Sequence, residues 1–161
     1  MRNRENAFNI MKALVDKFGH QISVSCKIRV LRNYEDTLKY ILAMQEAGVH
    51  WITIHPRTAA EETRVPARWY TVKSFLDTGL IKIPLLGSGD LFSPLDVHKY
   101  LTSTGAHGVI LARGAIHNPG IFQLKSQMLD RTQPLIDLPE TDEDWKDNTV
   151  EPKLSEDQKA E

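Results

Sequence analysis

Charged and polar side chains recur in this 161-residue sequence where apolar, β-branched runs give way to turn residues. Seven of these side chains have types that bind anions or electron-rich rings through charge or hydrogen bonds. They are Lys27, Arg29, His55, Arg57, Ser88, Asp90 and Arg113. Because binding residues of parallel α/β barrels lie at the carboxyl ends of the strands, we expect these side chains to meet on one rim.

Two of the expected strands end in glycine-containing turns, at residues 87–90 (GSGD) and 112–114 (ARG). Each turn leads from a strand into a helix. The first backbone N–H groups of a helix have no intrahelical partner and carry a partial positive charge, which attracts phosphate. The pair of turns therefore predicts a phosphate cradle.

Apolar periodicity identifies the elements that must position these residues. Helical spacing covers 6–18, 34–47, 69–76 and 95–101, a further helix opens at 118, and short β-branched runs cover 22–30, 49–54, 81–86 and 108–111. Ser93 and Pro94 are typical of a helix start, as cap and first residue. The order predicts one helix followed by four β-α units.

Strands that alternate with helices and read as continuous apolar runs indicate a parallel sheet covered by helices. A doubly wound sheet places its glycine-rich turn after the first strand, whereas here the glycines follow the last two strands. A TIM (β/α)₈ barrel builds its phosphate site after strands seven and eight. We therefore predict an α/β fold, the C-terminal half of a TIM barrel over residues 1–136, and expect the other half of a barrel of roughly 250 residues to lie upstream.

The last part of the sequence differs in composition. Residues 137–161 hold ten of the 21 acidic residues and three of the 20 Lys and Arg, which leaves 17 basic against 11 acidic residues before them. This composition predicts an acidic, disordered tail. The positive excess of residues 1–136 is compatible with a polyanionic partner, but it is weaker than the footprint of a dedicated nucleic-acid module.

The single cysteine, Cys26, excludes an internal disulfide framework, and no apolar run approaches the roughly 18 residues of a membrane span. These features indicate a reducing intracellular compartment, the cytoplasm, and no membrane partner. Alternation along the strand places Cys26 opposite Lys27, toward the helices, so we interpret it as a small core residue. No metal-site Cys/His spacing, P-loop or Ser-His-Asp order is present, so we expect no metal.

Four motifs stand in register at the predicted strand ends. They are VSCKIR (24–29), IHPRT (54–58), IPLLGSGDL (83–91) and GVILARGAIHNPGIF (108–122). In this order and spacing they resemble the second half of the flavin-dependent tRNA-dihydrouridine synthases. The resemblance covers roughly residues 6–125, and the form VSCKIR is most similar to the eukaryotic members of that family.

The resemblance implies an FMN-dependent oxidoreductase that uses NADPH to reduce the C5–C6 bond of a uridine in tRNA. It implies that Lys27 and His55 contact the flavin ring, while Arg29 and Arg57 lie near the uracil or the flavin edge and so bind substrate. It also implies a ribityl-phosphate site formed by Gly89, Asp90, Ala112 and Arg113.

The sequence departs from the family pattern in three ways. Pro56 replaces the usual glycine and removes a backbone donor, and Ser88 replaces the usual asparagine with a shorter hydroxyl, so we expect weaker FMN binding. The family's first four strands, with the loop whose cysteine protonates the uridine, have no counterpart here, and neither has its C-terminal RNA-binding domain. We therefore expect no catalytic residue in this chain and no activity from the chain alone.

Two other interpretations stay open. Four β-α units leave open sheet edges and an exposed apolar interior, so a non-enzymatic half-barrel could bind a phosphate ligand and associate with itself as a homo-oligomer. Another FMN barrel reductase, such as an ene-reductase or a dihydroorotate dehydrogenase, shares the late phosphate site. Such enzymes are not expected to combine the KIR motif (27–29) with the HxR motif (55–57).

Overall fold

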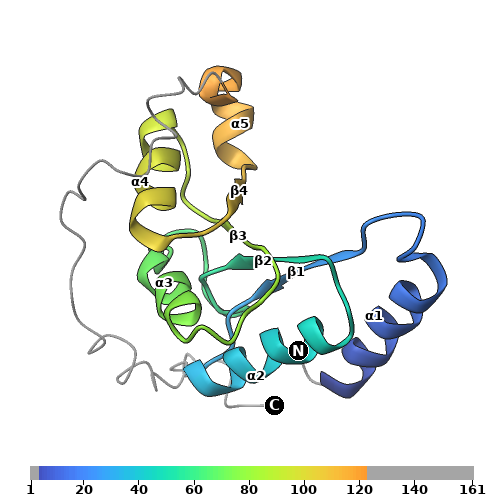
Figure 1. Ribbon diagram of the computed structural model, residues 1–161. Helices are drawn as coiled ribbons and strands as arrows, with labels where there is room; N and C mark the ends of the chain where they lie inside the picture. The colour runs from blue at the N-terminus through green and yellow to red at the C-terminus, as the bar shows by residue number, and fades with distance from the viewer. Residues whose placement is uncertain (1–3, 123–161) are drawn as a thin grey trace, which may run out of the picture.

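The computed structural model of the chain describes residues 4–122. The elements in chain order are α1 (Arg4–Phe18), β1 (Ser25–Arg29), α2 (Tyr34–Glu46), β2 (Trp51–His55), α3 (Trp69–Asp77), β3 (Leu85–Ser88), α4 (Pro94–Thr104), β4 (Gly108–Ile110), α5 (Arg113–His117) and the 3₁₀ helix η1 (Pro119–Phe122), as Figure 1 shows. The tail predicted for 137–161, and the part of the last predicted helix beyond Phe122, lie outside the described residues.

The strands β1 to β4 form one parallel sheet whose order follows the chain, β1-β2-β3-β4. The register places Arg29 beside His55 and Ile54 beside Gly87, so the carboxyl ends of neighbouring strands lie at one edge. A doubly wound sheet reverses its strand order, and this one does not. The prediction of a parallel α/β fold that forms part of a TIM barrel is confirmed.

Helices α2 and α4 begin where the sequence supplies a capping side chain. The side chain of Asn33 accepts a hydrogen bond from the Asp36 amide at the start of α2. Ser93 and Asp96 form a reciprocal capping box at the start of α4, with Pro94 as the first helical residue. Gly105 ends α4 in the left-handed region at φ 72°, where a side chain would be strained.

Helix α5 differs from the sequence prediction, which opened a helix at Asn118. In the structure a five-residue helix begins at Arg113 and ends before Asn118, and Pro119 then starts η1. The reason is that five residues are too few to show apolar periodicity, so the short helix has no signal in the sequence. Its consequence is that Arg113 is the first residue of a helix rather than part of an open turn.

The core lies between the sheet and helices α2, α3 and α4, which succeed one another across the sheet from β1 toward β4 in Figure 1. Ile28 of β1, Ile52 and Ile54 of β2 and Leu85 of β3 are buried on this side. Cys26 packs against the same cluster, and burial raises the pKa of its thiol to about 11. The predicted helix-facing position of Cys26 is therefore confirmed, and Lys27 and His55 project from the other side of their strands.

Candidate functional site

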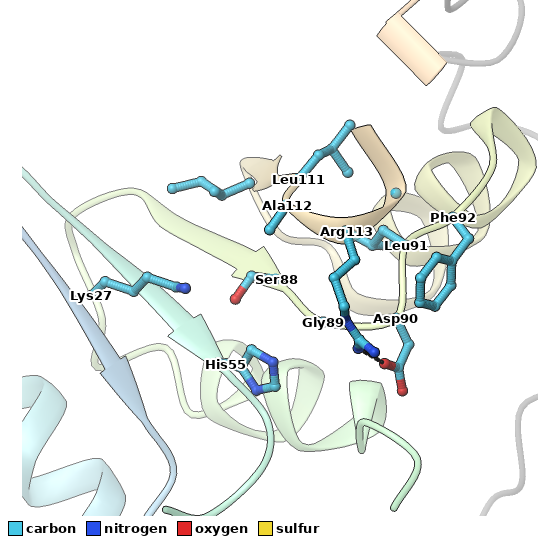
Figure 2. A pocket seen from close by; sticks show the side chains of 12 residues that line it. Lys27, His55, Ser88, Gly89, Asp90, Leu91, Phe92, Leu111, Ala112 and Arg113 are labelled. Atoms are coloured by element: carbon cyan, nitrogen blue, oxygen red, sulfur yellow. Dashed lines mark hydrogen bonds and ion pairs between the residues drawn. The ribbon is translucent and has the colours of Figure 1, made fainter. Parts of the chain in front are cut away.

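The carboxyl ends of the four strands surround one cavity of about 60 Å³. Its lining comprises Lys27, His55, Ser88, Gly89, Asp90, Leu91, Phe92 and residues 110–114. Figure 2 shows Lys27, His55 and Ser88 turned toward a common space, with Arg113 reaching down to Asp90. Because ligand pockets usually measure about 300–1,000 Å³, this cavity has room for one small group of a larger ligand.

The turn after β3 depends on two glycines. A Cβ at Gly87 would overlap the ring of Tyr100 on α4, so only glycine fits there. Gly89 has a φ of 105°, and a Cβ on it would lie 3.3 Å from Nε2 of His55 and 3.1 Å from Cβ of Ala67. The indole Nε1 of Trp69 donates to the Gly89 carbonyl at 3.1 Å and holds this turn in place. Gly87 therefore lets β3 pack against α4, and Gly89 brings the backbone close to the His55 ring at the cavity.

The turn after β4 is fixed against the turn after β3. A Cβ at Gly114, in the first turn of α5, would overlap the carbonyl oxygen of Leu91. The guanidinium of Arg113 lies 5.2 Å from the centre of the Phe92 ring, a cation–π contact. The two turns that the sequence predicted as a phosphate cradle are thus packed against each other.

Ser88, where the family pattern has asparagine, is buried, and its Oγ donates to the Ile54 carbonyl of the neighbouring strand at 3.3 Å. This hydroxyl ties β3 to β2 at the floor of the cavity. The substitution therefore leaves a satisfied side chain rather than an orphaned one.

His55 is held in its neutral form. Burial, and then the positive charges of Arg29, Arg57 and Lys27, lower its pKa from 6.5 to about 4. Its Nδ1 is buried and has no hydrogen-bond partner within the described residues. Near pH 7 the neutral ring therefore carries one donor and one acceptor nitrogen and adds no charge to the cavity.

Asp90 joins two arginines that the sequence placed separately. Nη2 of Arg57 donates to Asp90 Oδ2, and Nη2 of Arg113 donates to Asp90 Oδ1 at 3.1 Å. The amide of Ala67 donates to Oδ2 at 2.8 Å. Asp90 itself has a φ of 53°, which is uncommon for a residue with a side chain. The carboxylate is therefore fully engaged at the edge of the cavity.

Arg57, predicted to bind substrate, is only 1% exposed. Besides Asp90, its guanidinium donates to the carbonyl oxygens of Val65 and, at 3.2 Å, Thr63. Arg29, also predicted to bind substrate, donates to the Thr58 carbonyl at 2.8 Å. Both groups therefore hold residues 58–68 of the loop between β2 and α3, and neither lines the cavity.

This loop is also stabilised from within. Arg68 donates to Glu61 through two nitrogens, one of them at 2.9 Å, and Glu61 accepts from the Thr58 amide. Burial alone would raise the pKa of Glu61, but the hydrogen bonds from Arg68 and Thr58 lower it below its ordinary value. The sequence predicted only a polar loop here, and the alternation of acidic and basic residues was the available signal for an internal ion pair.

Between residues 4 and 122 no helix is both long and apolar enough to cross a membrane. In the same part of the chain, no group of three or more His, Cys, Asp or Glu side chains is placed to hold a metal ion.

The sequence is similar to a known protein family and to several of its members. The family model described as dihydrouridine synthase (Dus) matches residues 1–149. The tRNA-dihydrouridine(20a/20b) synthase of Saccharomyces cerevisiae is 32% identical over 121 residues, covering 74% of this chain and 33% of the yeast protein. The tRNA-dihydrouridine(16) synthase of Neisseria meningitidis serogroup A is 32% identical over 124 residues, covering 75% of this chain and 36% of the relative.

A probable tRNA-dihydrouridine synthase of Aquifex aeolicus is 34% identical over 102 residues, covering 63% of this chain and 32% of that protein. The chain thus spans about a third of the length of these curated relatives. Since the family match covers most of the chain and includes every residue of the cavity, this protein belongs to the dihydrouridine synthase family.

Proposed function

We propose that this chain forms the flavin-binding half of a tRNA-dihydrouridine synthase, an oxidoreductase that uses FMN and NADPH to reduce the C5–C6 bond of a uridine in tRNA. The observation that carries the proposal is the cavity where Lys27, neutral His55 and Arg113 meet beside two close-packed turns. The match to the dihydrouridine synthase family supports this chemistry over that of the other FMN barrel reductases.

The residues present fit a flavin nucleotide. The orphaned Nδ1 of His55 calls for a polar ligand atom, and Gly89 leaves room that a Cβ would fill. The cavity of about 60 Å³ suits one polar group of the cofactor rather than the whole molecule. In this proposal, FMN is held by Lys27, His55, Gly89, Ala112 and Arg113, and Asp90 lies beside its anionic group as the partner of Arg113.

Bound FMN would supply hydride-transfer chemistry to the site. Lys27 would place a positive charge, and His55 a neutral hydrogen-bonding ring, against electron-rich atoms of the cofactor. Backbone N–H groups at the start of α5 and the guanidinium of Arg113 would orient an anionic group. Arg29 and Arg57 would act on the uridine through the loop 58–68, which they hold at the rim.

In this proposal the described residues supply no cysteine to the cavity as proton donor. Cys26 is the single cysteine of the chain, its thiol lies on the helix-facing side, and burial raises its pKa to about 11. A cysteine in that position does not protonate a uridine at the cavity. We therefore propose that uridine reduction needs residues beyond this chain, with tRNA as the substrate of the complete assembly.

Titration of the full chain with FMN tests the proposal. We expect saturable quenching of flavin fluorescence, weakened in Lys27→Met because Lys27 lines the cavity, and unchanged in Lys99→Met because Lys99 lies exposed on α4. Absence of saturable binding, or equal binding by Lys27→Met, would refute the flavin site. NADPH-dependent dihydrouridine formation in tRNA by the chain alone would refute the need for further residues.

A second candidate, a self-associating half-barrel, is favoured by the sheet edges. Within the described strands, β1 and β4 each pair on one side only, and Ile110 of β4 is 39% exposed. Unpaired edges with exposed apolar residues favour association. Sedimentation should show a homo-oligomer that Ile110→Lys weakens and Ile116→Lys, on α5 and 79% exposed, does not. A monomer at high concentration would exclude this candidate.

A further inference from the structure

The cavity wall contains a negative charge where the proposed function requires an anion to bind. Asp90 lines the cavity, and its side chain is 24% exposed. A carboxylate beside a phosphate is repulsive unless its charge is compensated. A positively charged group must therefore compensate the Asp90 charge before an anion can bind beside it.

The two arginines that bind Asp90 occupy different environments. The side chain of Arg57 is 2% exposed and reaches the carboxylate from inside the protein, while that of Arg113 is 43% exposed and lines the cavity. Two guanidinium groups against one carboxylate leave the cluster with one net positive charge. Because Arg57 is buried and Arg113 is accessible, that surplus charge lies on the side that faces the cavity.

We propose that Arg57 is a positioning residue that compensates the Asp90 charge from behind, so that Arg113 keeps its positive charge for a phosphate group in the cavity. This inference rests on the proposed flavin site. Without Arg57, Asp90 and Arg113 would form a neutral pair, and the anion would meet no surplus positive charge there. Asp90 in turn holds the Arg113 side chain at the rim.

Arg57 also ties this charge arrangement to the loop. Its Nη2 donates to Asp90 and to the carbonyl of Thr63, and the same Asp90 oxygen accepts from the Ala67 amide. Loss of the forked Arg57 guanidinium would remove its hydrogen bonds to Asp90 and to the loop carbonyls, and residues 63–67 would become more mobile. The Ala67 amide therefore reports on the arrangement without any ligand.

The test compares three variants of the full chain with wild type. Arg57→Met removes the buried charge, Arg57→Met/Asp90→Asn removes both partners and restores the net charge of the cluster, and Arg57→Lys keeps the charge without the fork. Arg64→Met is the matched control, since Arg64 has an 83% exposed side chain on the same loop. Affinities for FMN, for riboflavin, which lacks the phosphate, and for inorganic phosphate are measured, together with hydrogen exchange of the Ala67 amide.

We expect Arg57→Met to weaken FMN binding roughly ten- to a hundredfold, the worth of one charge-assisted hydrogen bond from Arg113 to the phosphate, and to leave riboflavin binding unchanged. The double variant and Arg57→Lys should recover most of the FMN affinity. In Arg57→Met and Arg57→Lys the Ala67 amide should exchange faster than in wild type. If Arg57→Met does not fold, near-wild-type FMN affinity in the other two variants and faster Ala67 exchange in Arg57→Lys still carry the test.

Four results would overturn the inference. They are wild-type FMN affinity in Arg57→Met, equal loss of FMN and riboflavin affinity in Arg57→Met, a double variant no better than the single one, and unchanged Ala67 exchange in Arg57→Lys. The first of these, in which wild type and Arg57→Met bind FMN equally well, leaves the proposed function intact. A wild-type chain that binds neither FMN nor inorganic phosphate would remove both.

Discussion

The neutral state of His55 makes the stability of the protein depend on pH in a defined window. The folded chain protonates this ring only near pH 4, whereas the unfolded chain does so near the ordinary value of 6.5. Between these values the unfolded state binds a proton that the folded state does not, so stability falls as the pH falls from about 6.5 to about 4 and is unaffected by His55 above that range. Stability falls on acidification because folding lowers the pKa of the His55 imidazole.

The magnitude follows from the size of the pKa shift. Between about pH 7.5 and pH 5, linkage gives a loss of about 2 kcal/mol in the free energy of unfolding for an unscreened group. The ring is partly exposed, so solvent screening reduces the expected loss to about 1 kcal/mol. Replacement by the uncharged His55→Gln should remove this part of the pH dependence.

Urea unfolding followed by circular dichroism at both pH values measures the effect. The difference between the two free energies should be smaller in His55→Gln by about 1 kcal/mol, while His117→Gln, an exposed change on α5 outside the cavity, should keep the wild-type difference. An identical pH dependence in wild type and His55→Gln would show that the ring is not held neutral, and the hydrogen-bonding role proposed for it would fail.

The remaining predictions concern the packing behind the cavity. Gly87→Ala should lower the free energy of unfolding by about 1–3 kcal/mol, because its Cβ would overlap the Tyr100 ring. Gly108→Ala, whose Cβ would lie 3.7 Å from Leu86, should lower it far less. Urea denaturation compares the two variants, and equal losses would contradict the geometry. Tyr100→Phe should keep the free energy of unfolding or raise it by up to about 1 kcal/mol, because the buried Tyr100 hydroxyl has no hydrogen-bond partner within the described residues. A clear loss of stability in the same assay would contradict this prediction.

The strand ends of the site could be predicted from the sequence because they follow from topology alone. Once four apolar runs alternate with helices, parallel pairing brings Lys27, His55, Ser88 and Arg113 to one edge, and the structure places all four around the cavity. Alternation likewise placed Cys26 on the helix side.

Side-chain pairing could not be predicted in the same way. The Arg57–Asp90 pair joins residues 33 positions apart, and whether a guanidinium turns outward to a ligand or inward to a carboxylate depends on rotamers and distances that a pattern does not encode. The same holds for Gly87, whose glycine is explained by Tyr100 on another element rather than by its own turn. The sequence therefore located the rim but not the division between residues that face a ligand and residues that support them.

The contact between Gly114 and the carbonyl of Leu91 has a consequence for changing what the site accepts. With no space for even a methyl group between them, the turn after β3 and the start of α5 behave as one mechanical piece. Enlarging the cavity by shifting one turn would force the other to move, together with Arg113 and its partner Asp90. Evolution or design that seeks a different ligand here would therefore begin with Lys27 on β1, whose side chain lines the cavity from outside both turns.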